Sequence, residues 1–300
     1  MKIMKFGGTS VGSGERMLHV AEVIKNFNGG QKVVVVVSAM NGVTDNLICL
    51  FQKYKSGDLL SGVLEIRTLY EFHKDALRKL GLKKKDYVYT KQSLFRLFGD
   101  LNIYLSICND FSLSDYDYVI SFGEKFSSYL LSATLNKIGV AAEPVDASNI
   151  IVASSEFSNA RAILADTKIK ANRFLLPLFS KRIVPVVTGF FGATKRGDIV
   201  TLGRGGSDYS ATILGNVLDA SEVILWKEVD GVFNGDPKKD KKAMFHPELT
   251  YKEALSLAKN GAKVLHPEAM KPVQSKGIVV WVKNIFKPES LGTKIWKGAI

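Results

Sequence analysis

The chain of 300 residues is 46% hydrophobic and 23% charged, proportions of an ordinary soluble globular protein that can hold one α/β domain or two lobes. No apolar run approaches the roughly 20 residues that span a bilayer, which excludes a transmembrane helix. The net charge of +12 comes from scattered lysines, and the lysine clusters at 83–85 and 238–242 lack the interleaved aromatics of single-strand nucleic-acid binders.

Signals for targeting, disulfides and metals are few. Residues 1–6 lead directly into a glycine turn and contain no apolar signal-peptide region, which predicts a cytoplasmic protein. Cys49 and Cys108 have no metal-like spacing and fall in predicted helices, so we interpret them as two buried, reduced thiols. His19 and His73 are interpreted as surface or packing residues, and no two of the four histidines have zinc spacing.

The first predicted strand, residues 3–6, runs into a glycine-rich loop over 7–14, after which apolar residues recur at helical spacing. A strand, a glycine loop and a helix in this order can place a phosphate at the helix N-terminus. The loop matches neither a Walker P-loop nor a complete Rossmann fingerprint. Lys5, at the carboxyl end of the strand, either faces a ligand at the sheet edge or is an ordinary edge-strand lysine.

The second predicted strand covers residues 32–37, whose unbroken valines indicate burial on both faces. In the following loop, residues 38–45, Thr44 or Asp45 can cap the next helix. Residues 45–118 are predicted to be mostly helical and carry no recognisable chemistry.

The middle of the chain alternates predicted strands and helices. Glu124 falls in the first turn of a helix that follows a predicted strand over 118–121, a position where the helix dipole favours a carboxylate. An amphipathic helix within 160–176 should end near Pro177. Further strands are predicted over 140–145 and 183–188, and a polar hairpin over 193–198.

Residues 201–210 combine three glycines, Arg204 and a Ser207-Asp208 pair that opens an apolar helical run. Ser207 at the N-cap would satisfy an orphan backbone donor, and Asp208 in the first turn would complement the helix dipole. The glycines let a ligand approach the backbone N–H groups, and Arg204 offers a planar fork to a carboxylate or phosphate. The alternative interpretation is a surface turn before a helix.

The last third of the chain has the same alternation. Strands are predicted over 223–226 and 278–282, helices over 250–259 and 268–274, and a turn-rich loop over 227–237. Helices that alternate with apolar strands predict an α/β fold with a largely parallel central sheet sandwiched by helices. We expect two tightly joined lobes, residues 1–195 with a helical insertion at about 45–118, and residues 196–300.

Four glycine- or hydroxyl-rich turns follow predicted strands, at 7–10, 38–45, 189–192 and 203–208. In a parallel sheet such turns gather at the carboxyl edge, so we expect them to line one crevice. Lys5 suits a phosphate, Arg204 a carboxylate, and Glu124 an amine or hydroxyl. Positive groups without an obvious general base suit phosphoryl transfer, and a carboxylate acceptor is already ionised at neutral pH.

Five motifs occur in order across nearly the whole chain: Lys5-Phe-Gly-Gly-Thr-Ser-Val11, Ser121-Phe-Gly-Glu124, Thr201-Leu-Gly-Arg-Gly-Gly-Ser-Asp208, Trp226 with Asp230-Gly231 and Asp236-Pro237, and Gly261-Ala-Lys-Val-Leu-His-Pro267. Together they resemble the aspartate kinases of the amino acid kinase family. The resemblance implies the amino acid kinase fold and transfer of the γ-phosphoryl of ATP to the side-chain carboxylate of L-aspartate. The products would be 4-phospho-L-aspartate and ADP, at the first step of lysine, threonine and methionine biosynthesis. It also implies Mg²⁺ and a homodimer.

Carried onto this sequence, the resemblance assigns a role to each motif residue. Arg204 would hold the α-carboxylate of aspartate and Glu124 its ammonium, with Ser38, Thr44, Phe190 and Ser207 completing the pocket. Lys5 would neutralise the transferring phosphoryl group. Asp208 would organise the phosphate region near Mg²⁺, which would be bound mainly through the ATP phosphates and not directly by the protein. The ATP site would comprise Lys5, Gly7, Gly8, Thr9, Ser10, Gly205, Gly206, Lys227, Glu228, Phe233, Asp236, Lys238 and Lys263. The N-terminal lobe would then bind aspartate and the C-terminal lobe the nucleotide.

The sequence departs from the family pattern in two places. Lys227-Glu228 stands where many relatives have Thr-Asp, and Phe233 where many have Tyr, which leaves the contacts to adenine and ribose open. Aspartate kinases also usually continue into paired ACT domains that bind inhibitory amino acids, and none fits after Gly292. We therefore expect either a catalytic fragment or a short enzyme, insensitive in both cases to lysine and threonine.

Other functions are weighed against this one. A different amino acid kinase would phosphorylate acetylglutamate, glutamate or uridylate instead of aspartate. A catalytically silent nucleotide-binding subunit would be expected to lack Lys5, Arg204 or Asp208, and all three are present. A nucleic-acid binder is motivated only by the net charge.

Overall fold

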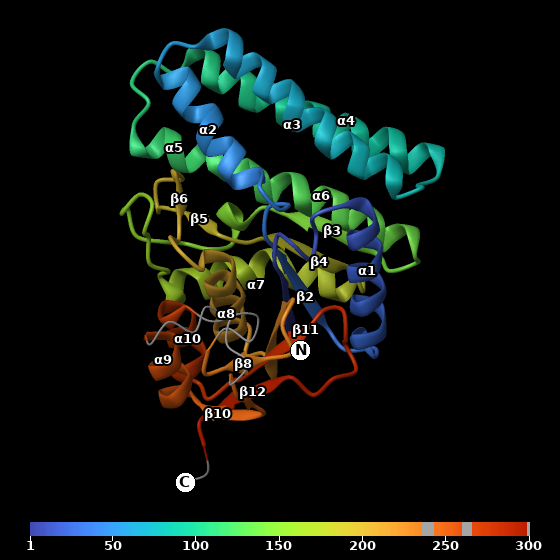
Figure 1. The fold of residues 1–300 in the computed structure, drawn as a ribbon, viewed down its shortest axis with the longest axis vertical. Coiled ribbons are helices and arrows are strands. Elements are labelled where there is room, and N and C mark those ends of the chain that lie inside the picture. The colour runs from blue at the N-terminus through green and yellow to red at the C-terminus, as the bar shows by residue number, and fades with distance from the viewer. Residues whose placement is uncertain (236–242, 260–265, 299–300) are drawn as a thin grey trace.

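The computed structural model describes residues 1–235, 243–259 and 266–298 as an α/β protein built on one central sheet (Figure 1). Its strands lie in the order β10-β12-β11-β7-β1-β2-β4-β3. The six strands from β11 to β3 run parallel, while β12 is antiparallel to β11 and parallel to β10. The strand bounds are β1 Lys2–Phe6, β2 Val33–Val37, β3 Ala142–Val145, β4 Val184–Thr188, β7 Glu222–Lys227, β10 Glu248–Thr250, β11 Val279–Asn284 and β12 Thr293–Trp296. The predicted largely parallel sheet is confirmed.

Side chains of successive strand residues enter two different cores, one on each face of the sheet. In β2, Val33, Val35 and Val37 belong to one buried cluster, whereas Val34 and Val36 belong to the other. The first core lies under α1 (Gly14–Asn28) and α6 (Phe122–Lys137), and the second under α7 (Leu164–Ser180) and α8 (Gly206–Val217). This two-sided burial explains why β2 consists entirely of valine.

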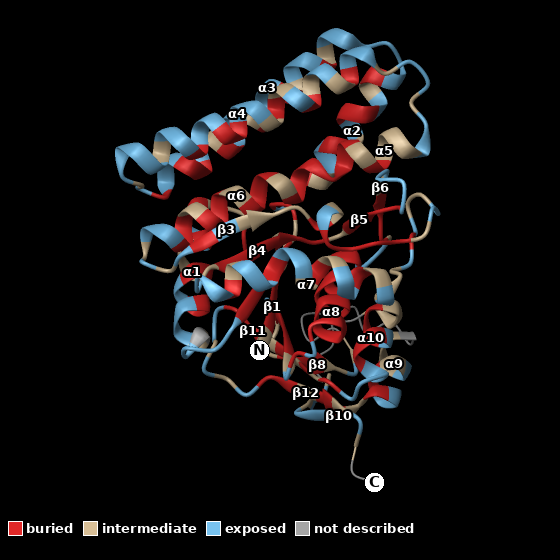
Figure 2. Ribbon diagram, turned by 180° about the vertical axis from the view of Figure 1, so that it is seen from behind, coloured by how far each residue is buried: buried red, intermediate tan, exposed pale blue. Residues whose placement is uncertain are grey.

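A stack of helices extends beyond α6 on the first face of the sheet (Figure 2). It contains α2 (Val43–Lys55), α3 (Leu59–Lys79), α4 (Lys84–Ile107) and α5 (Leu113–Ile120). This confirms the predicted helical content of residues 45–118. The apolar sides of these helices continue the first core, and their outer sides are exposed.

The predicted strand over 118–121 is wrong, because these residues end helix α5. Ser112 and Asp115 form a reciprocal capping box that starts α5, and the helix then continues until Ser121, where α6 begins. The strand prediction relied on a few β-favouring residues, and the cap upstream outweighs their weak preference.

Three predicted helix ends also differ from the structure. Helix α7 runs past Pro177 to Ser180, so the proline lies inside its last turn. Helix α2 begins at Val43 after the N-cap Gly42, which leaves neither Thr44 nor Asp45 as a cap. Helix α8 begins at Gly206 after the N-cap Gly205, so Ser207 lies within its first turn and is not the cap. Both N-cap glycines have positive φ, a backbone conformation that favours glycine over a residue with a capping side chain.

The remaining elements are short. A hairpin is present near the predicted polar segment 193–198, but that segment is mainly its turn. Its strands are β5 (Phe191–Ala193) and β6 (Ile199–Thr201), and a second two-stranded sheet pairs β8 (Val232–Phe233) with β9 (Phe245–His246). Helices α9 (Tyr251–Lys259) and α10 (Pro267–Gln274) follow. Strands β8, β9, β10 and β12 were not predicted, because they are short and paired only through tertiary contacts.

The environments of three predicted residues can be compared directly. Cys49 and Cys108 are free thiols, but Cys49 is exposed and Cys108 only partly buried, so the prediction of two buried thiols is wrong. His73 is a fully buried packing residue, as predicted. The described residues contain no helix long and apolar enough to cross a membrane. The division into lobes at residue 195 stays a prediction.

Candidate active site

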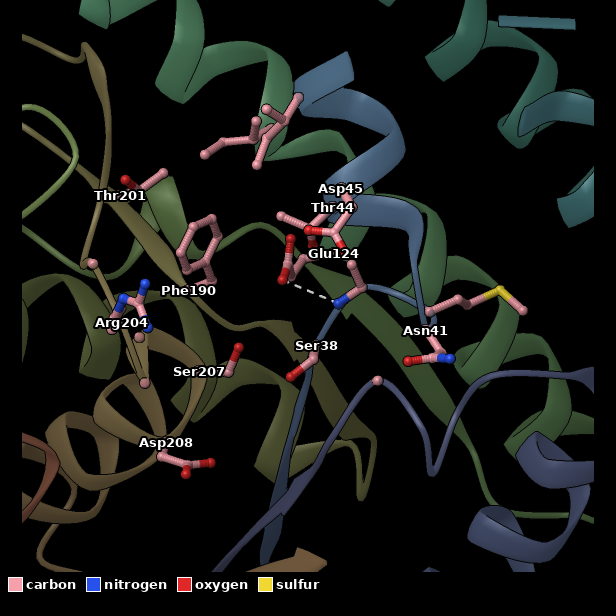
Figure 3. Close-up of a pocket in the computed structure, with 18 of the residues that line it drawn as sticks. Ser38, Asn41, Thr44, Asp45, Glu124, Phe190, Thr201, Arg204, Ser207 and Asp208 are labelled. Atoms are coloured by element: carbon pink, nitrogen blue, oxygen red, sulfur yellow. Dashed lines mark hydrogen bonds between the residues drawn. The ribbon is translucent and has the colours of Figure 1, made fainter. Parts of the chain in front are cut away.

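A pocket of about 1110 Å³ opens at the carboxyl ends of β1, β2 and β4 (Figure 3). Residues from all four predicted turns line it, which confirms that the turns meet in one crevice. Its lining contains Lys5, Gly8, Ser38, Thr44, Glu124, Phe190, Arg204, Gly205, Gly206, Ser207, Asp208 and Lys227. Twelve of the residues predicted for the site are therefore brought together by the fold.

One side of the pocket holds a carboxylate between two lysines. Asp208, in the first turn of α8, lies 2.7 Å from Lys5 Nζ through Oδ1 and 2.6 Å from Lys227 Nζ through Oδ2. Burial opposes ionisation of Asp208, but the ammonium groups of Lys227 and Lys5 outweigh it and hold the pKa of this carboxyl well below its usual range. Burial and the neighbouring Lys227 lower the pKa of Lys5, and Asp208 opposes them. The three charges leave a net positive cluster in the pocket.

The glycine loop between β1 and α1 packs tightly against the loop that follows β2. A Cβ at Gly8 would lie 2.7 Å from the carbonyl oxygen of Ala39, so only glycine fits there. The hydroxyl of Ser10 is buried and has no hydrogen-bond partner among the described residues. An unpartnered hydroxyl between a glycine loop and a helix start fits a phosphate-binding role. Gly7, Thr9 and Ser10 lie in the same loop as Gly8 but are not part of the pocket lining.

Glu228 lies near this loop through Arg16, a residue of α1. The Arg16 guanidinium is 3.0 Å from Glu228 Oε1 and also donates to the carbonyl oxygen of Thr9. Glu228 therefore reaches the glycine loop through an ion pair and is not in the pocket lining. Phe233 packs on Phe245, with ring centroids 5.5 Å apart, and is likewise outside the lining. The predicted residues Asp236, Lys238 and Lys263 lie outside the described part of the chain.

The opposite side of the pocket holds a second buried carboxylate, Glu124, in the first turn of α6. It is 3% exposed and accepts a hydrogen bond of 3.0 Å from the backbone N–H of Ala39 (Figure 3). Its other oxygen, Oε2, has no partner among the described residues. Burial raises the pKa of Glu124 to about 8, against the hydrogen bond from Ala39 and the charge of Lys5. A buried carboxylate with a free oxygen is suited to receive a cation.

Phe190 and Arg204 close the pocket from the side of β4 and β6. Phe190 has φ +75°, an unfavourable conformation for a residue with a side chain, and its N–H donates to Ser210 Oγ at 3.0 Å. A Cβ at Gly206 would lie 2.9 Å from the Phe190 ring, so α8 packs directly on it. Arg204 is exposed in the loop between β6 and α8, with its side chain beside Phe190 in the pocket (Figure 3).

Several pocket residues were missed by the sequence analysis. They are Ala39, Met40, Asn41, Gly42, Asp45, Ile48, Tyr116, Ile120, Ser158, Thr201, Gly203 and His266. Thr201 and His266 belong to motifs that were recognised, but no role was predicted for them. His266 packs against the turn at 203–208, because a Cβ at Gly205 would lie 2.5 Å from His266 Cβ. Tyr116 and Ser158 carry no local signal.

Protein side chains offer little for direct metal binding here. No group of three or more histidine, cysteine or acidic residues that could hold a metal occurs within residues 1–235, 243–259 and 266–298. Both oxygens of Asp208 are already engaged by lysines.

Comparison with known proteins gives relatives over the full chain. The chain is 38% identical over 299 residues to aspartokinase 1, chloroplastic, of Arabidopsis thaliana, and the match covers 98% of this chain and 52% of the relative. It is 39% identical over 298 residues to aspartokinase 2, chloroplastic, of the same plant, covering 98% of this chain and 54% of the relative. The chain thus spans about half the length of these curated relatives.

Solved structures show the same similarity. Escherichia coli aspartokinase III, solved in complex with aspartate and ADP, superposes with a TM-score of 0.90 at 27% identity, over 100% of this chain and 65% of that one. UMP kinase from Bacillus anthracis shares the fold alone, with a TM-score of 0.56 at 15% identity, over 99% of this chain and 96% of that one. The amino acid kinase family model matches residues 1–284. By fold, pocket and sequence, the chain belongs to the amino acid kinase family.

Proposed function

We propose that this chain is an aspartate kinase that transfers the γ-phosphoryl group of ATP to the side-chain carboxylate of L-aspartate. The observation that carries the proposal is the composition of the pocket. One side offers a buried carboxylate, Glu124, and an arginine, Arg204, which match the two charges of an α-amino acid. The other side offers the Lys5–Asp208–Lys227 cluster, which matches a phosphate. The similarity to aspartokinases supports aspartate as the acceptor.

In this proposal the acceptor amino acid lies between Glu124 and Arg204. The free oxygen of Glu124 accepts from the substrate ammonium, and the Arg204 guanidinium holds the α-carboxylate in a bidentate contact. Ser38, Thr44, Phe190 and Ser207 surround the side chain and exclude other acceptors. These contacts leave the β-carboxylate directed toward the lysine cluster.

The reaction then needs no general base, because the β-carboxylate is ionised at neutral pH. One of its oxygens attacks the γ-phosphorus, the bond from that phosphorus to the bridging oxygen of ADP breaks, and ADP leaves with the electron pair. Lys5 and Lys227 neutralise charge on the transferring group, while Asp208 keeps the two ammonium groups apart and in place.

The nucleotide phosphates are proposed to lie on two helix starts. Gly7, Gly8, Thr9 and Ser10 precede α1, and Gly205 and Gly206 begin α8, so both loops present backbone N–H groups. Mg²⁺ would bind mainly through the ATP phosphates and supply further charge neutralisation. Glu228, Phe233, Asp236, Lys238 and Lys263 stay proposed contacts of the nucleotide.

Three further features stay proposals on the same basis. They are a cytoplasmic location, a homodimer, and a place at the first step of lysine, threonine and methionine biosynthesis. The resemblance of the motifs to aspartate kinases supports the pathway step and the dimer.

The proposed function is tested with a coupled assay of ADP release across four acceptors. Aspartate, glutamate, N-acetylglutamate and UMP are each supplied with ATP and Mg²⁺. Turnover with aspartate well above the other three is expected. Turnover with one of the other three and none with aspartate would reject the proposal in favour of a different amino acid kinase, and no turnover with any acceptor would indicate a silent subunit.

A further inference from the structure

Asp117 is a buried carboxylate outside the pocket lining that contacts two segments of the pocket wall. It lies in α5, is 0% exposed, and accepts four hydrogen bonds. Its Oδ2 accepts from the backbone N–H groups of Ser158 at 2.7 Å and of Thr201 at 2.8 Å. Its Oδ1 accepts from the hydroxyls of the same two residues at 3.1 and 2.9 Å. One carboxylate therefore joins two segments that are far apart in sequence.

Both segments lie next to Arg204, the arginine of the proposed acceptor site. Thr201 ends β6, three residues before Arg204, and its carbonyl oxygen accepts from Ala160 N–H at 2.9 Å. A Cβ at Gly203 would lie 2.8 Å from Asn159 Oδ1 and 3.3 Å from the carbonyl oxygen of Ser158. The loop around residue 158 therefore packs directly on the residue before Arg204.

Ser158 also needs an external contact to keep its backbone conformation. Its φ is +66°, in the left-handed region that is unfavourable for a residue with a Cβ. Asp117 fixes this residue through both its N–H and its hydroxyl. Ser158, Thr201, Gly203 and Arg204 all line the pocket, and Asp117 contacts the first two of them directly.

We propose that Asp117 is a positioning residue for the amino acid acceptor, one that holds Arg204 at the correct distance from Glu124 through Ser158 and Thr201. This inference rests on the proposed function, because it takes Arg204 and Glu124 as the acceptor contacts. Asp117 does not touch the substrate and acts only through the wall that it anchors. Its removal therefore weakens acceptor binding more than it affects ATP binding.

The hydrogen-bond pattern provides a conservative variant. In Asp117→Asn the side-chain oxygen can accept from the two backbone N–H groups, and the amide NH₂ can donate to the two hydroxyl oxygens, which accept as well as donate. The wall then keeps its position although the charge is lost. Asp117→Glu does the opposite, because it keeps the charge but lengthens the side chain by one methylene. Asp117→Ala removes the anchor.

Asp115 supplies a matched control on the same helix. It accepts from Ser112 N–H, from Ser112 Oγ and from Tyr104 OH, and it does not line the pocket. Asp115→Ala therefore removes a comparable set of hydrogen bonds from α5 without affecting the contacts to Ser158 and Thr201. It reports what a loss of helix stability alone does to catalysis.

The experiment measures kcat and the KM values for aspartate and ATP, together with the thermal unfolding midpoint, for the 300-residue chain and these variants. Asp117→Ala and Asp117→Glu are expected to raise the KM for aspartate about tenfold or more, with the KM for ATP within about twofold. Asp117→Asn is expected to stay within about threefold of the wild type in both KM values. Asp115→Ala is expected to lower the unfolding midpoint and leave the KM for aspartate unchanged.

Several results would overturn the inference. It fails if Asp117→Ala leaves the KM for aspartate unchanged, if it raises the KM for ATP equally, or if Asp115→Ala matches it. Should Asp117→Ala not fold, the Asn and Glu variants decide, and a raised KM in Asn but not in Glu shows a role of charge, not position. Failure of the proposed function is separate, since the wild type would then not turn over aspartate, and the same KM comparison is made with the acceptor that it does use.

Discussion

Two buried carboxylates on opposite sides of one pocket show opposite electrostatics. Asp208 is held between two ammonium groups at 2.7 and 2.6 Å, and its pKa is well below the usual range despite its burial. Among the described residues Glu124 accepts one hydrogen bond from another residue, the backbone N–H of Ala39, and burial raises its pKa to about 8. The carboxylate of Asp208 thus contacts two ammonium groups, whereas that of Glu124 contacts none among the described residues.

This difference separates a group that shapes the site from a group that awaits a ligand. Asp208 already has its counterions within the protein, so its role is to place Lys5 and Lys227 and to reduce their mutual repulsion. Glu124 forms no ion pair among the described residues, and a substrate ammonium at its free oxygen would supply one. The comparison therefore predicts different kinetic effects for changes on the two sides.

The largest effect is expected at Lys5, the more buried lysine of the Lys5–Asp208–Lys227 cluster. Lys5→Met keeps most of the apolar stem but removes the ammonium that faces the transferring phosphoryl group. We expect kcat to fall by about 10³ with a much smaller change in the KM for aspartate, because this charge acts mainly in the transition state. Steady-state ADP release measures both values.

Lys2→Met is the matched control, because Lys2 is at the other end of β1 and pairs with Glu222 at 3.0 Å, away from the pocket. It should leave kcat unchanged. Equal losses in the two variants would show that the strand, and not the charge at residue 5, is what turnover requires.

On the other side of the pocket, Glu124→Gln should act on binding. The amide is nearly isosteric and can still accept from Ala39 N–H, but it offers no charge to the ammonium of aspartate. We expect the KM for aspartate to rise about 10- to 30-fold while the KM for ATP and kcat change little. A fall in kcat without a change in KM would place Glu124 in the transition state and remove the contrast with Lys5.

The raised pKa of Glu124 gives this prediction a pH signature. Below pH 8 the free protein holds Glu124 mainly protonated, and binding of an ammonium requires the ionised form. The KM for aspartate should therefore fall roughly tenfold as pH rises from 6.5 to 8. In Glu124→Gln the same pH interval should leave the KM nearly flat, and a slope equal to that of the wild type would exclude Glu124 as its cause.

A smaller effect is expected at Lys227, the more exposed partner of Asp208. Its side chain is 22% exposed, against 7% for Lys5, so water can replace part of its charge. We expect Lys227→Met to lower kcat about tenfold and to raise the KM for ATP by a similar factor. A loss as large as that of Lys5→Met would show that the two lysines act as one unit around Asp208.

Lys5, Glu124 and Arg204 could be predicted from the sequence because their signals are local. Lys5, Glu124 and Arg204 each lie in a short motif next to a strand or a helix start, and the parallel sheet brings such motifs to one edge. The contacts that Asp117 makes with Ser158 and Thr201 could not be predicted in the same way. Asp117 meets Ser158 and Thr201 at separations of 41 and 84 residues, and the helix that contains it was predicted partly as a strand.

The fold shows the same division between local and long-range causes. Runs such as the valines of β2 are unambiguous because burial on both faces demands them. Short strands such as β8 and β12 have no pattern of their own and exist only because a partner strand lies beside them. The positive φ of Ser158 and Phe190 likewise has no sequence signal, since the surrounding structure imposes it.

The smallest effect on turnover is expected at His73, a buried ionisable group that is not part of the pocket lining. It packs among aromatic rings of the helical stack, with Phe126 at 4.8 Å between centroids, and burial lowers its pKa to about 4. Its pKa is therefore shifted as clearly as that of Glu124. If a shift alone marked a functional residue, His73→Leu would impair catalysis, whereas we expect kcat and both KM values to stay within about twofold.

What His73 should change is stability in acid. The unfolded chain binds a proton at the ordinary histidine pKa of 6.5, and the folded chain binds it only near 4, so the stability contribution is complete above pH 6.5 and is lost as pH falls toward 4. Between pH 7 and 5 the wild type should lose about 2 kcal/mol more unfolding free energy than His73→Leu, as measured by urea denaturation. An equal loss of unfolding free energy in the wild type and in His73→Leu would mean that water reaches the His73 ring in solution. The expected result separates burial without function, at His73, from burial that prepares a binding site, at Glu124.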